Sequence, residues 1–198
     1  MTDYENVAGN YYDKFSATNP LVRWMMQGFK NTLLNFTQQI SFNAMLEIGC
    51  GEGHIQQLLP PAQSLATDID LPIVRDAKVR YPHAHYVVAD GTQMPLPSAS
   101  FDLVIAVEVL EHVPQPLRLL QESKRLSQRY CIFSVPREPL WRVLNMARGR
   151  YWTDLGNTPG HINHWSGRSF RRFVEQELTI LDIQQPLPWT MILCEVRS

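Results

Sequence analysis

Apolar residues recur at steps of three or four between residues 21 and 40. This spacing is typical of an amphipathic helix that packs one face on a core. Pro20 precedes the pattern, at a position that the first turn of a helix tolerates. A helix is therefore predicted from residue 20, with its buried face made of Leu21, Met25, Phe29, Leu33, Phe36 and Ile40.

Beyond residue 43 the pattern changes to short apolar runs that alternate with helical stretches. Such an alternation predicts a parallel sheet covered by helices on both faces, a doubly wound α/β fold. Strands are expected at 44–48, 64–68, 85–89, 101–107 and 130–135, and helices at 54–59, 71–80, 116–127 and 139–148.

The end of the chain departs from this alternation. Two strand-like runs, 179–183 and 190–196, are separated by only six residues. That spacing fits a hairpin and is too short for a helical crossover. The prediction is a mostly parallel seven-stranded sheet with an antiparallel C-terminal strand.

Length and composition agree with one globular domain. The chain has 198 residues, of which 44% are hydrophobic and 19% charged. The net charge of −1 argues against a general polyanion binder, so nucleic acid is not an expected partner. No apolar run reaches the roughly 18 residues of a membrane span.

Two observations bear on location. The first residues, 1–5, are acidic and polar, unlike a signal peptide. The three cysteines, Cys50, Cys131 and Cys194, form neither a zinc pattern nor a disulfide framework. A reducing cytoplasmic compartment is therefore expected.

The strongest chemical signal is the run Leu46-Glu-Ile-Gly-Cys-Gly-Glu-Gly53. Glycines after a strand let the backbone approach a ligand closely. Asp68 ends the next strand, at a spacing that suits a carboxylate bound to ribose hydroxyls. The glycines fall as G-x-G-x-G rather than the dinucleotide pattern G-x-G-x-x-G, and Glu47 and Glu52 would repel a pyrophosphate but accept a cation. The alternative is an ordinary strand-to-helix turn.

Four segments together resemble the successive motifs of class I S-adenosylmethionine-dependent methyltransferases: 47–53, Asp68, 89–91 and 101–113. Their order and spacing match that family, and the terminal hairpin matches its Rossmann-like sheet. The resemblance covers most of the chain. It implies S-adenosyl-L-methionine as cofactor and S-adenosyl-L-homocysteine as product, and it says little about the methyl acceptor.

The resemblance also implies roles for individual residues. The loop from Gly49 through Cys50 to Gly51 would pass under the methionine part of the cofactor, and Glu47 would position its amino end. The remaining contacts would be Asp68 with the ribose, Ile69 with the adenine face, Asp90 and Gly91 with the adenine edge, and Val107 with the methionyl region.

A further segment, Asn19-Pro-Leu-Val-Arg23, is similar to an Asn-Pro-x-Arg segment of ubiquinone-biosynthesis O-methyltransferases, with one extra residue. That similarity implies a contact between Arg23 and the cofactor carboxylate. The alternative is that Arg23 is a solvated helix residue. Tyr11 or Tyr12 could also close over the cofactor.

Three polar residues follow the fourth predicted strand, at the sheet edge where ligands bind: Glu108, Glu111 and His112. The pattern Glu-x-x-Glu-His resembles a motif of two metal-using branches of that family. These are the ubiquinone O-methyltransferases and the 2′-O-methyltransferases of small-RNA 3′ ends. The latter draw a further histidine from a His-x-x-x-Trp segment, which His161 to Trp165 matches.

These four groups could hold a divalent metal that lowers the pKa of an acceptor hydroxyl. Metal-free relatives carry Glu-His-Val at the same place, where the histidine is a base or structural. The prediction adopted is a metal-free site whose catalytic candidates are Glu108, Glu111, His112 and His161.

The segment 137–172 is locally basic, with seven arginines against two acidic residues, and it carries Trp141, Trp152 and Trp165. An insertion after the fifth strand lies where this fold usually places its acceptor lid. Arginine and tryptophan together suit an anionic or aromatic acceptor, or a membrane surface that bears a lipophilic one. The alternative is solvated arginines and core tryptophans.

The expected organisation is a single methyltransferase domain over 1–198. It comprises an N-terminal helical cap (1–42), a cofactor-binding half (43–136), an acceptor-side lid (137–165) and a C-terminal helix and hairpin (166–198). The predicted reaction is methyl transfer to an oxygen or nitrogen of a small molecule. Two alternatives stay open: a metal-assisted O-methyltransferase for RNA ribose or a quinone-type lipid, and a cofactor-binding protein without turnover. The oligomeric state stays open too.

Overall fold

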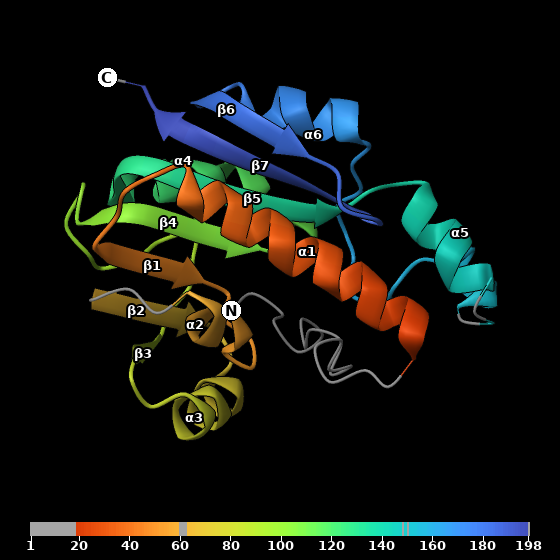
Figure 1. Cartoon of the computed structure of the whole chain (residues 1–198), viewed down its shortest axis with the longest axis horizontal. Helices are drawn as coiled ribbons and strands as arrows, with labels where there is room; N and C mark the ends of the chain where they lie inside the picture. The colour runs from red at the N-terminus through yellow and green to blue at the C-terminus, as the bar shows by residue number, and fades with distance from the viewer. Residues whose placement is uncertain (1–18, 60–62, 148, 150, 198) are drawn as a thin grey trace.

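The computed structural model describes residues 19–59, 63–147, 149 and 151–197. Its core is a sheet whose strands are, in chain order, Ala44–Ile48 (β1), Gln63–Asp68 (β2), His85–Val88 (β3), Phe101–Val107 (β4), Ser127–Pro136 (β5), Leu178–Gln184 (β6) and Trp189–Val196 (β7). Their spatial order is β3-β2-β1-β4-β5-β7-β6 (Figure 1).

Strand directions confirm the predicted fold class. β1 to β5 pair in parallel, with Leu46 opposite Val104 between β1 and β4. β7 runs antiparallel to both β5 and β6. The antiparallel strand is therefore inserted between two others, and β6 forms the edge, because the short connection after Gln184 allows only a hairpin.

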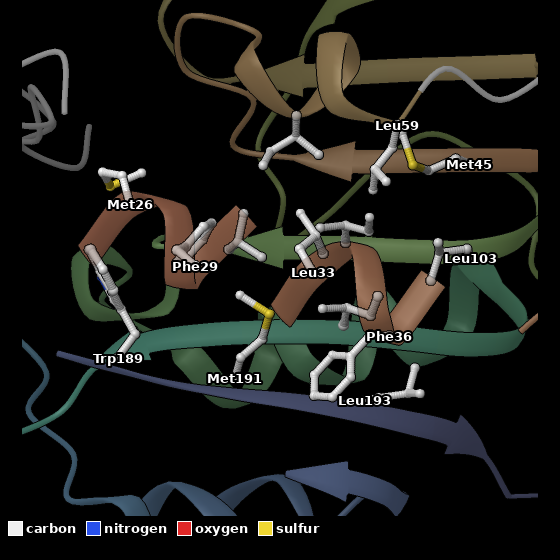
Figure 2. Close-up of a cluster of buried hydrophobic side chains, with 14 of the residues drawn as sticks. Met26, Phe29, Leu33, Phe36, Met45, Leu59, Leu103, Trp189, Met191 and Leu193 are labelled. Carbon is white, nitrogen blue, oxygen red and sulfur yellow. The ribbon is translucent and has the colours of Figure 1, made fainter. Parts of the chain in front are cut away.

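One face of the sheet is covered by α1 (Pro20–Gln38), which crosses it in front in Figure 1. The side-chain oxygen of Asn19 caps this helix by accepting from the backbone N–H groups of Leu21 and Val22. Phe29, Leu33 and Phe36 are buried against β5 and β7, as Figure 2 shows, so the predicted amphipathic helix is confirmed. Its predicted buried face is wrong at Leu21, which is exposed, while Val22 is buried.

The opposite face carries α4 (Pro116–Leu126) and α6 (Gly167–Val174). Leu119, Leu120 and Phe170 pack there on Phe133 and its neighbours. At the other end of the sheet, α2 (His54–Leu58) follows β1 and α3 (Leu71–Arg80) lies beside β2 and β3. Helices on both faces explain why the central strands are almost continuously apolar.

Two segments at the carboxyl ends of the strands shape the site. A short 3-10 helix, η1 (Leu110–His112), follows β4. After β5 the chain leaves the sheet through α5 (Leu140–Ala147) and a second 3-10 turn, η2 (Trp152–Asp154). The chain returns to the sheet at Trp165, whose carbonyl oxygen accepts from Glu138 N. The insertion therefore begins and ends at the same place, the carboxyl end of β5.

Some predicted boundaries shift. β5 begins at Ser127 instead of residue 130, because the Ser127 hydroxyl, bonded to Arg129 N and to the Tyr130 carbonyl, holds an irregular start that still pairs with Phe101. Tyr11, Tyr12, Arg148 and Arg150 lie outside the described residues. In the part of the chain that the structure describes, no helix is both long and apolar enough to cross a bilayer.

Candidate functional site

A cavity of about 400 Å³ opens at the carboxyl ends of β1, β2 and β4. β1 lies between β2 and β4, so the chain order of the strands reverses at this point. Open parallel sheets bind ligands at such a reversal, because the connections on either side diverge and leave a crevice. The location of the cavity thus follows from the topology.

The glycine loop after β1 forms the floor of the cavity. Gly49 and Gly51 have φ of 72° and 49°, which favours glycine. A Cβ at Gly49 would lie 2.4 Å from a methyl of Val109, whereas a Cβ at Gly51 would meet nothing within 4 Å. The loop therefore packs tightly on one side and leaves room on the other. Cys50 also lines the cavity, and its N–H donates to the Thr67 carbonyl.

Asp68 ends β2 beside this loop. Its Oδ2 accepts from the backbone N–H of Gly51 at 3.0 Å, and its Oδ1 accepts from that of Asp70 at 3.1 Å. These bonds fix a carboxylate at the cavity wall. Ile69 follows with an exposed side chain that also lines the cavity and offers an apolar surface.

A third wall comes from the loop after β3. Asp90 Oδ1 accepts from the N–H and the hydroxyl of Thr92, at 2.8 and 2.7 Å. A Cβ at Gly91 would lie 2.4 Å from a methyl of Ile48, so the loop approaches β1 closely. Asp90 and Gly91 both line the cavity.

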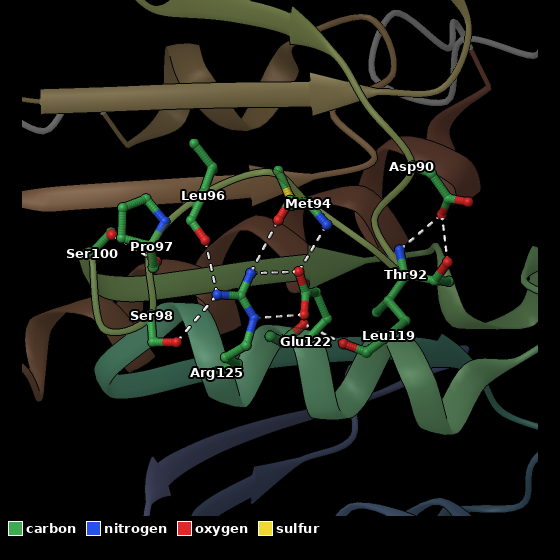
Figure 3. A network of polar contacts seen from close by, with 11 residues as sticks. Asp90, Thr92, Met94, Leu96, Pro97, Ser98, Ser100, Leu119, Glu122 and Arg125 are labelled. Carbon is green, nitrogen blue, oxygen red and sulfur yellow. Dashed lines mark hydrogen bonds and ion pairs between the residues drawn. The ribbon is translucent and has the colours of Figure 1, made fainter.

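This loop is fastened to α4 by hydrogen bonds between its backbone and an ion pair within the helix, Glu122 with Arg125, as Figure 3 shows. Glu122 accepts from the N–H of Met94 at 2.8 Å and from Arg125 at 2.7 Å. The same guanidinium donates to the carbonyl oxygens of Leu96 and Met94. The network connects the loop that carries Asp90 to a rigid helix.

Glu47 lies beneath the glycine loop and is 1% exposed. Its pKa is raised to about 8, chiefly by burial; a hydrogen bond from Gln56 opposes the rise, and the charge of Asp68 contributes to it. That bond, from Gln56 Nε2, measures 2.5 Å, and the Gln56 amide oxygen accepts from Ser64. A nearby cation stabilises the ionised form of a carboxyl group most strongly when burial has raised its pKa in this way.

Glu108, predicted as a catalytic candidate, is held by two side-chain hydrogen bonds. Its Oε2 accepts from Trp189 Nε1 at 2.6 Å and its Oε1 from the Ser134 hydroxyl at 3.3 Å. Its φ of 60° is unusual for a residue with a side chain. These bonds tie β4 to β5 and β7, so the carboxylate has a structural function in addition to lining the cavity.

Glu111, His112 and His161 come together at the far end of the cavity. One ligand atom from each lies within 4.8 Å of the others. The two imidazole rings meet edge to face at 4.9 Å, and His161 stacks on Trp141. The structure thus gathers three of the four expected catalytic candidates, while Glu108 is not in this cluster. Three oxygen and nitrogen donors fit a divalent cation in type, although the expected fourth ligand is missing from the group.

Outcomes differ for the other predicted residues. Val107 lines the cavity. Arg23 is exposed on α1 and is not among the described residues that line it, so its role stays a prediction. Sequence reasoning missed Met26, Phe29 and Trp189 as cavity walls and Gln56 as the partner of Glu47. The helical period of α1 signalled Phe29, as a core residue, whereas Met26 was outside the predicted buried face.

Part of the chain is similar to known methyltransferases. Residues 46–133 match the family model described as "Methyltransferase domain". Over 84 residues the chain is 36% identical to a Mycobacterium tuberculosis protein named "Probable S-adenosylmethionine-dependent methyltransferase", covering 41% of this chain and 31% of that protein. It is 25% identical over 138 residues to a ubiquinone biosynthesis O-methyltransferase of Haemophilus ducreyi, covering 64% and 58%. The chain thus matches about a third of the length of the first of these relatives.

Solved structures agree on the fold. A protein of Pyrococcus horikoshii superimposes with a TM-score of 0.72 at 15% identity over all of both chains. The N-methyltransferase NodS of Bradyrhizobium japonicum, solved with S-adenosyl-L-homocysteine, gives 0.71 at 16% identity over 98% and 96%. Together with the match over residues 46–133 to the methyltransferase-domain family model, these findings confirm the resemblance to S-adenosylmethionine-dependent methyltransferases that the sequence predicted.

Proposed function

We propose that this protein transfers a methyl group from S-adenosyl-L-methionine to an oxygen or nitrogen of a small-molecule acceptor. The observation that carries the proposal is the convergence of the glycine loop, Asp68 and Asp90 on one cavity whose far end holds Glu111, His112 and His161. The family match over residues 46–133 supports the same reading.

The cavity residues fit this cofactor group by group. Asp68 offers a fixed carboxylate for a ribose diol, and Asp90 and Gly91 offer polar atoms to the adenine edge, with Ile69 against its face. The open side of Gly51 leaves room for the methionyl chain. Buried Glu47 favours the positive charge of the amino and sulfonium groups.

When bound, the cofactor would supply an electrophilic methyl group, and its sulfonium sulfur would keep the electron pair of the broken bond and so lose its positive charge. The protein therefore has to align the acceptor and keep the site dry. Phe29, Met26 and Trp189 form an apolar wall beside the histidines, which favours an aromatic or otherwise apolar body in the acceptor. Val107 closes the wall near the methionyl region.

His112 is the group best suited to take the acceptor's proton. Its Nδ1 donates to the carbonyl oxygen of Gly160 at 2.9 Å, which leaves Nε2 as the basic nitrogen of the neutral ring. Glu111 and His161 lie beside it and would orient the acceptor or stabilise the imidazolium that forms.

The cluster of Glu111, His112 and His161 also favours a second candidate, a metal-assisted O-methyltransferase for RNA ribose or a quinone-type lipid. Those residues would hold a divalent ion, which would lower the pKa of an acceptor hydroxyl. Turnover that is abolished by chelators and restored by magnesium or manganese would favour this candidate, whereas full activity in excess chelator would remove it.

Partners and location belong to the proposal as well. The exposed side chains of Trp24, Trp152 and Leu155 favour contact with a membrane surface that presents a lipophilic acceptor. The three cysteines are free thiols, consistent with a reducing, cytoplasmic setting. Binding of this chain to liposomes, measured by sedimentation, tests the membrane contact.

Calorimetric titration with S-adenosyl-L-homocysteine tests the cofactor assignment. Asp68→Ala should weaken binding by about 1–3 kcal/mol, because ribose hydroxyls lose a charged partner. Asp182→Ala, on the distant edge strand β6, is the matched control and should bind like the wild type. Failure of the wild type to bind, or unchanged affinity in Asp68→Ala, contradicts the assignment.

Turnover is tested with methyl-labelled S-adenosyl-L-methionine and a panel of phenols, carboxylates and amines. Steady formation of a methylated product excludes a binding protein without turnover. Cofactor binding with no transfer to any class of acceptor, including lipid extracts and RNA, would favour that alternative.

A further inference from the structure

We propose that Asn163 is a positioning residue of the active site. It fastens the return segment of the insertion, residues 158–163, to η1 and thereby sets the orientation and the proton position of His112. The catalytic meaning of this role rests on the proposed function, whereas the geometry and the tautomer do not.

The side chain of Asn163 joins both ends of η1. Its Nδ2 donates to the carbonyl oxygen of Leu110 at 3.0 Å and to that of Val113 at 2.7 Å. The backbone N–H groups of Ile162 and Asn163 donate to the carbonyl oxygen of Glu111, at 2.9 and 3.1 Å. Within η1 and its cap, the carbonyl oxygen of Leu110 accepts a long bond from Val113 N at 3.4 Å, and a 3-10 helix of three residues cannot pair its last carbonyl oxygens internally. The return segment supplies further donors.

The chemistry of the contact requires an amide at position 163. Both partners are carbonyl oxygens, which only accept, and one amide nitrogen can donate to both. A carboxylate of the same shape would place negative oxygens against the two carbonyls. A leucine would remove the amide donor from both carbonyls and leave that of Leu110 with the 3.4 Å bond from Val113 N. The bonds span 53 and 50 positions of sequence, so they fix tertiary structure instead of local structure.

A second link reaches His112 itself. Its Nδ1 lies 2.9 Å from the carbonyl oxygen of Gly160, and a carbonyl can only accept, so the neutral ring carries its proton on Nδ1. Gly160 has a φ of 85°, and a Cβ there would lie 3.4 Å from His112 Nδ1. Glycine is therefore the residue that brings this carbonyl to the ring.

The two links act together on the reaction. His112 Nε2 would take the acceptor's proton as the bond between the acceptor atom and the methyl carbon forms and the carbon–sulfur bond breaks. The ring then carries a proton on each nitrogen, and it returns one to solvent. The Gly160 carbonyl accepts from Nδ1 throughout. If the return segment moved away from η1, the ring would lose both its orientation and the bond that selects its tautomer.

The test is nitrogen NMR of the full chain labelled with ¹⁵N-histidine, with His112 assigned from the signals lost in His112→Gln. In the wild type, we expect His112 to show the Nδ1–H tautomer, although isolated neutral imidazole side chains favour Nε2–H. In Asn163→Asp, we expect a mixture of tautomers and amide exchange at residues 110–113 that is at least about tenfold faster. Asn31→Asp makes the same chemical change on the exposed face of α1 and should change neither signal.

A wild-type His112 in the Nε2–H form overturns the proposal, and so does an Asn163→Asp variant with wild-type tautomer and exchange. If that variant does not fold, Asn163→Gln replaces it, since the longer amide keeps the donor but displaces it and should give an intermediate exchange rate. Titration with S-adenosyl-L-homocysteine on the same samples separates the two proposals. Absence of binding contradicts the proposed function and leaves the tautomer result standing.

Discussion

The indole nitrogen of Trp189 donates a hydrogen bond to Oε2 of Glu108 at 2.6 Å, across 81 positions of sequence. The bond joins the start of β7 to the residue directly after β4. Glu108 adopts a positive φ of 60°, which persists only where neighbouring groups hold it. Trp189 is therefore both a wall of the cavity and an anchor for the turn that leads to His112.

Trp189→Phe should keep the packing on Phe29 and remove the donor. We expect the free energy of unfolding to fall by about 1.5–3 kcal/mol, because the bond goes to a partly buried carboxylate. Urea denaturation followed by circular dichroism measures this change. Trp24→Phe makes the same replacement at a side chain that is 62% exposed and should stay within about 0.5 kcal/mol of the wild type. Equal losses in both variants would refute the anchoring role.

Stability should fall as pH rises, because of Glu47. Burial raises the pKa of this carboxyl from 4.5 to about 8. Between these values the folded chain holds a proton that the unfolded chain has released, so the contribution of Glu47 is fully present below pH 4.5 and is lost as pH rises to 8. The free energy of unfolding should drop by an amount on the order of 2–4 kcal/mol across this window. Urea titrations at pH 5, 6.5 and 8 measure it, and Glu47→Gln should flatten the profile. A wild-type profile as flat as that of the variant contradicts the argument.

Cofactor binding should release a proton from the same carboxyl. An ammonium or sulfonium group near Glu47 favours its ionised form, so at pH 7 a proton leaves as the ligand enters. Calorimetry of S-adenosyl-L-methionine binding in two buffers with different ionisation enthalpies counts that proton. The Glu47→Gln variant should bind with no buffer dependence from this site, and equal proton release from both proteins would assign it elsewhere.

Arg125→Lys should loosen the loop that carries Asp90. The guanidinium donates at once to Glu122, Met94 and Leu96, and an ammonium group has neither the reach nor the fork to do so. We expect affinity for S-adenosyl-L-homocysteine to fall about three- to tenfold, a loss of about 1 kcal/mol. Calorimetry measures it, with Arg129→Lys, at an exposed pair with Glu195, as the control. Unchanged affinity in Arg125→Lys would separate this network from the cofactor site.

The same network has a pH signature of opposite sign to that of Glu47. Hydrogen bonds from Arg125 hold the pKa of Glu122 below its usual value of 4.5. The pair therefore stabilises the fold above the unfolded pKa, and this contribution is lost as pH falls through the lowered value. Glu122→Gln should make acid unfolding below pH 4.5 less steep.

His112→Ala should lower turnover with an identified acceptor by a factor of about 10² to 10⁴, the usual range for loss of a general base. Affinity for S-adenosyl-L-homocysteine should change by less than about twofold, because other residues are expected to hold the cofactor. His83→Ala removes an exposed imidazole and is the control. Wild-type kcat in His112→Ala would end the catalytic assignment, and restored turnover on adding imidazole would strengthen it.

Local pattern was sufficient for the elements and for the cofactor side of the site. The helical spacing of Phe29, Leu33 and Phe36 predicted α1, and glycines directly after an apolar run predicted the turn at Gly49 and Gly51. Asp68 could be placed because the carboxyl ends of neighbouring parallel strands share one edge. Glu108 shows the limit: adjacency in sequence to Glu111 and His112 suggested a shared task, yet its carboxylate is bonded to Trp189 and Ser134.

The sequence by itself determined the order of strands and helices along the chain, the glycine loop, and Asp68 as the carboxylate that follows it. Each of these depends on periodicity or on spacing within about twenty residues. Only the tertiary structure decided that His161 meets His112, that Asn163 joins Leu110 to Val113, and that Trp189 reaches Glu108. These contacts depend on the return path of the insertion and on the antiparallel strand between β5 and β6. Such paths are set by the packing of distant segments, which leaves no repeat in the local sequence.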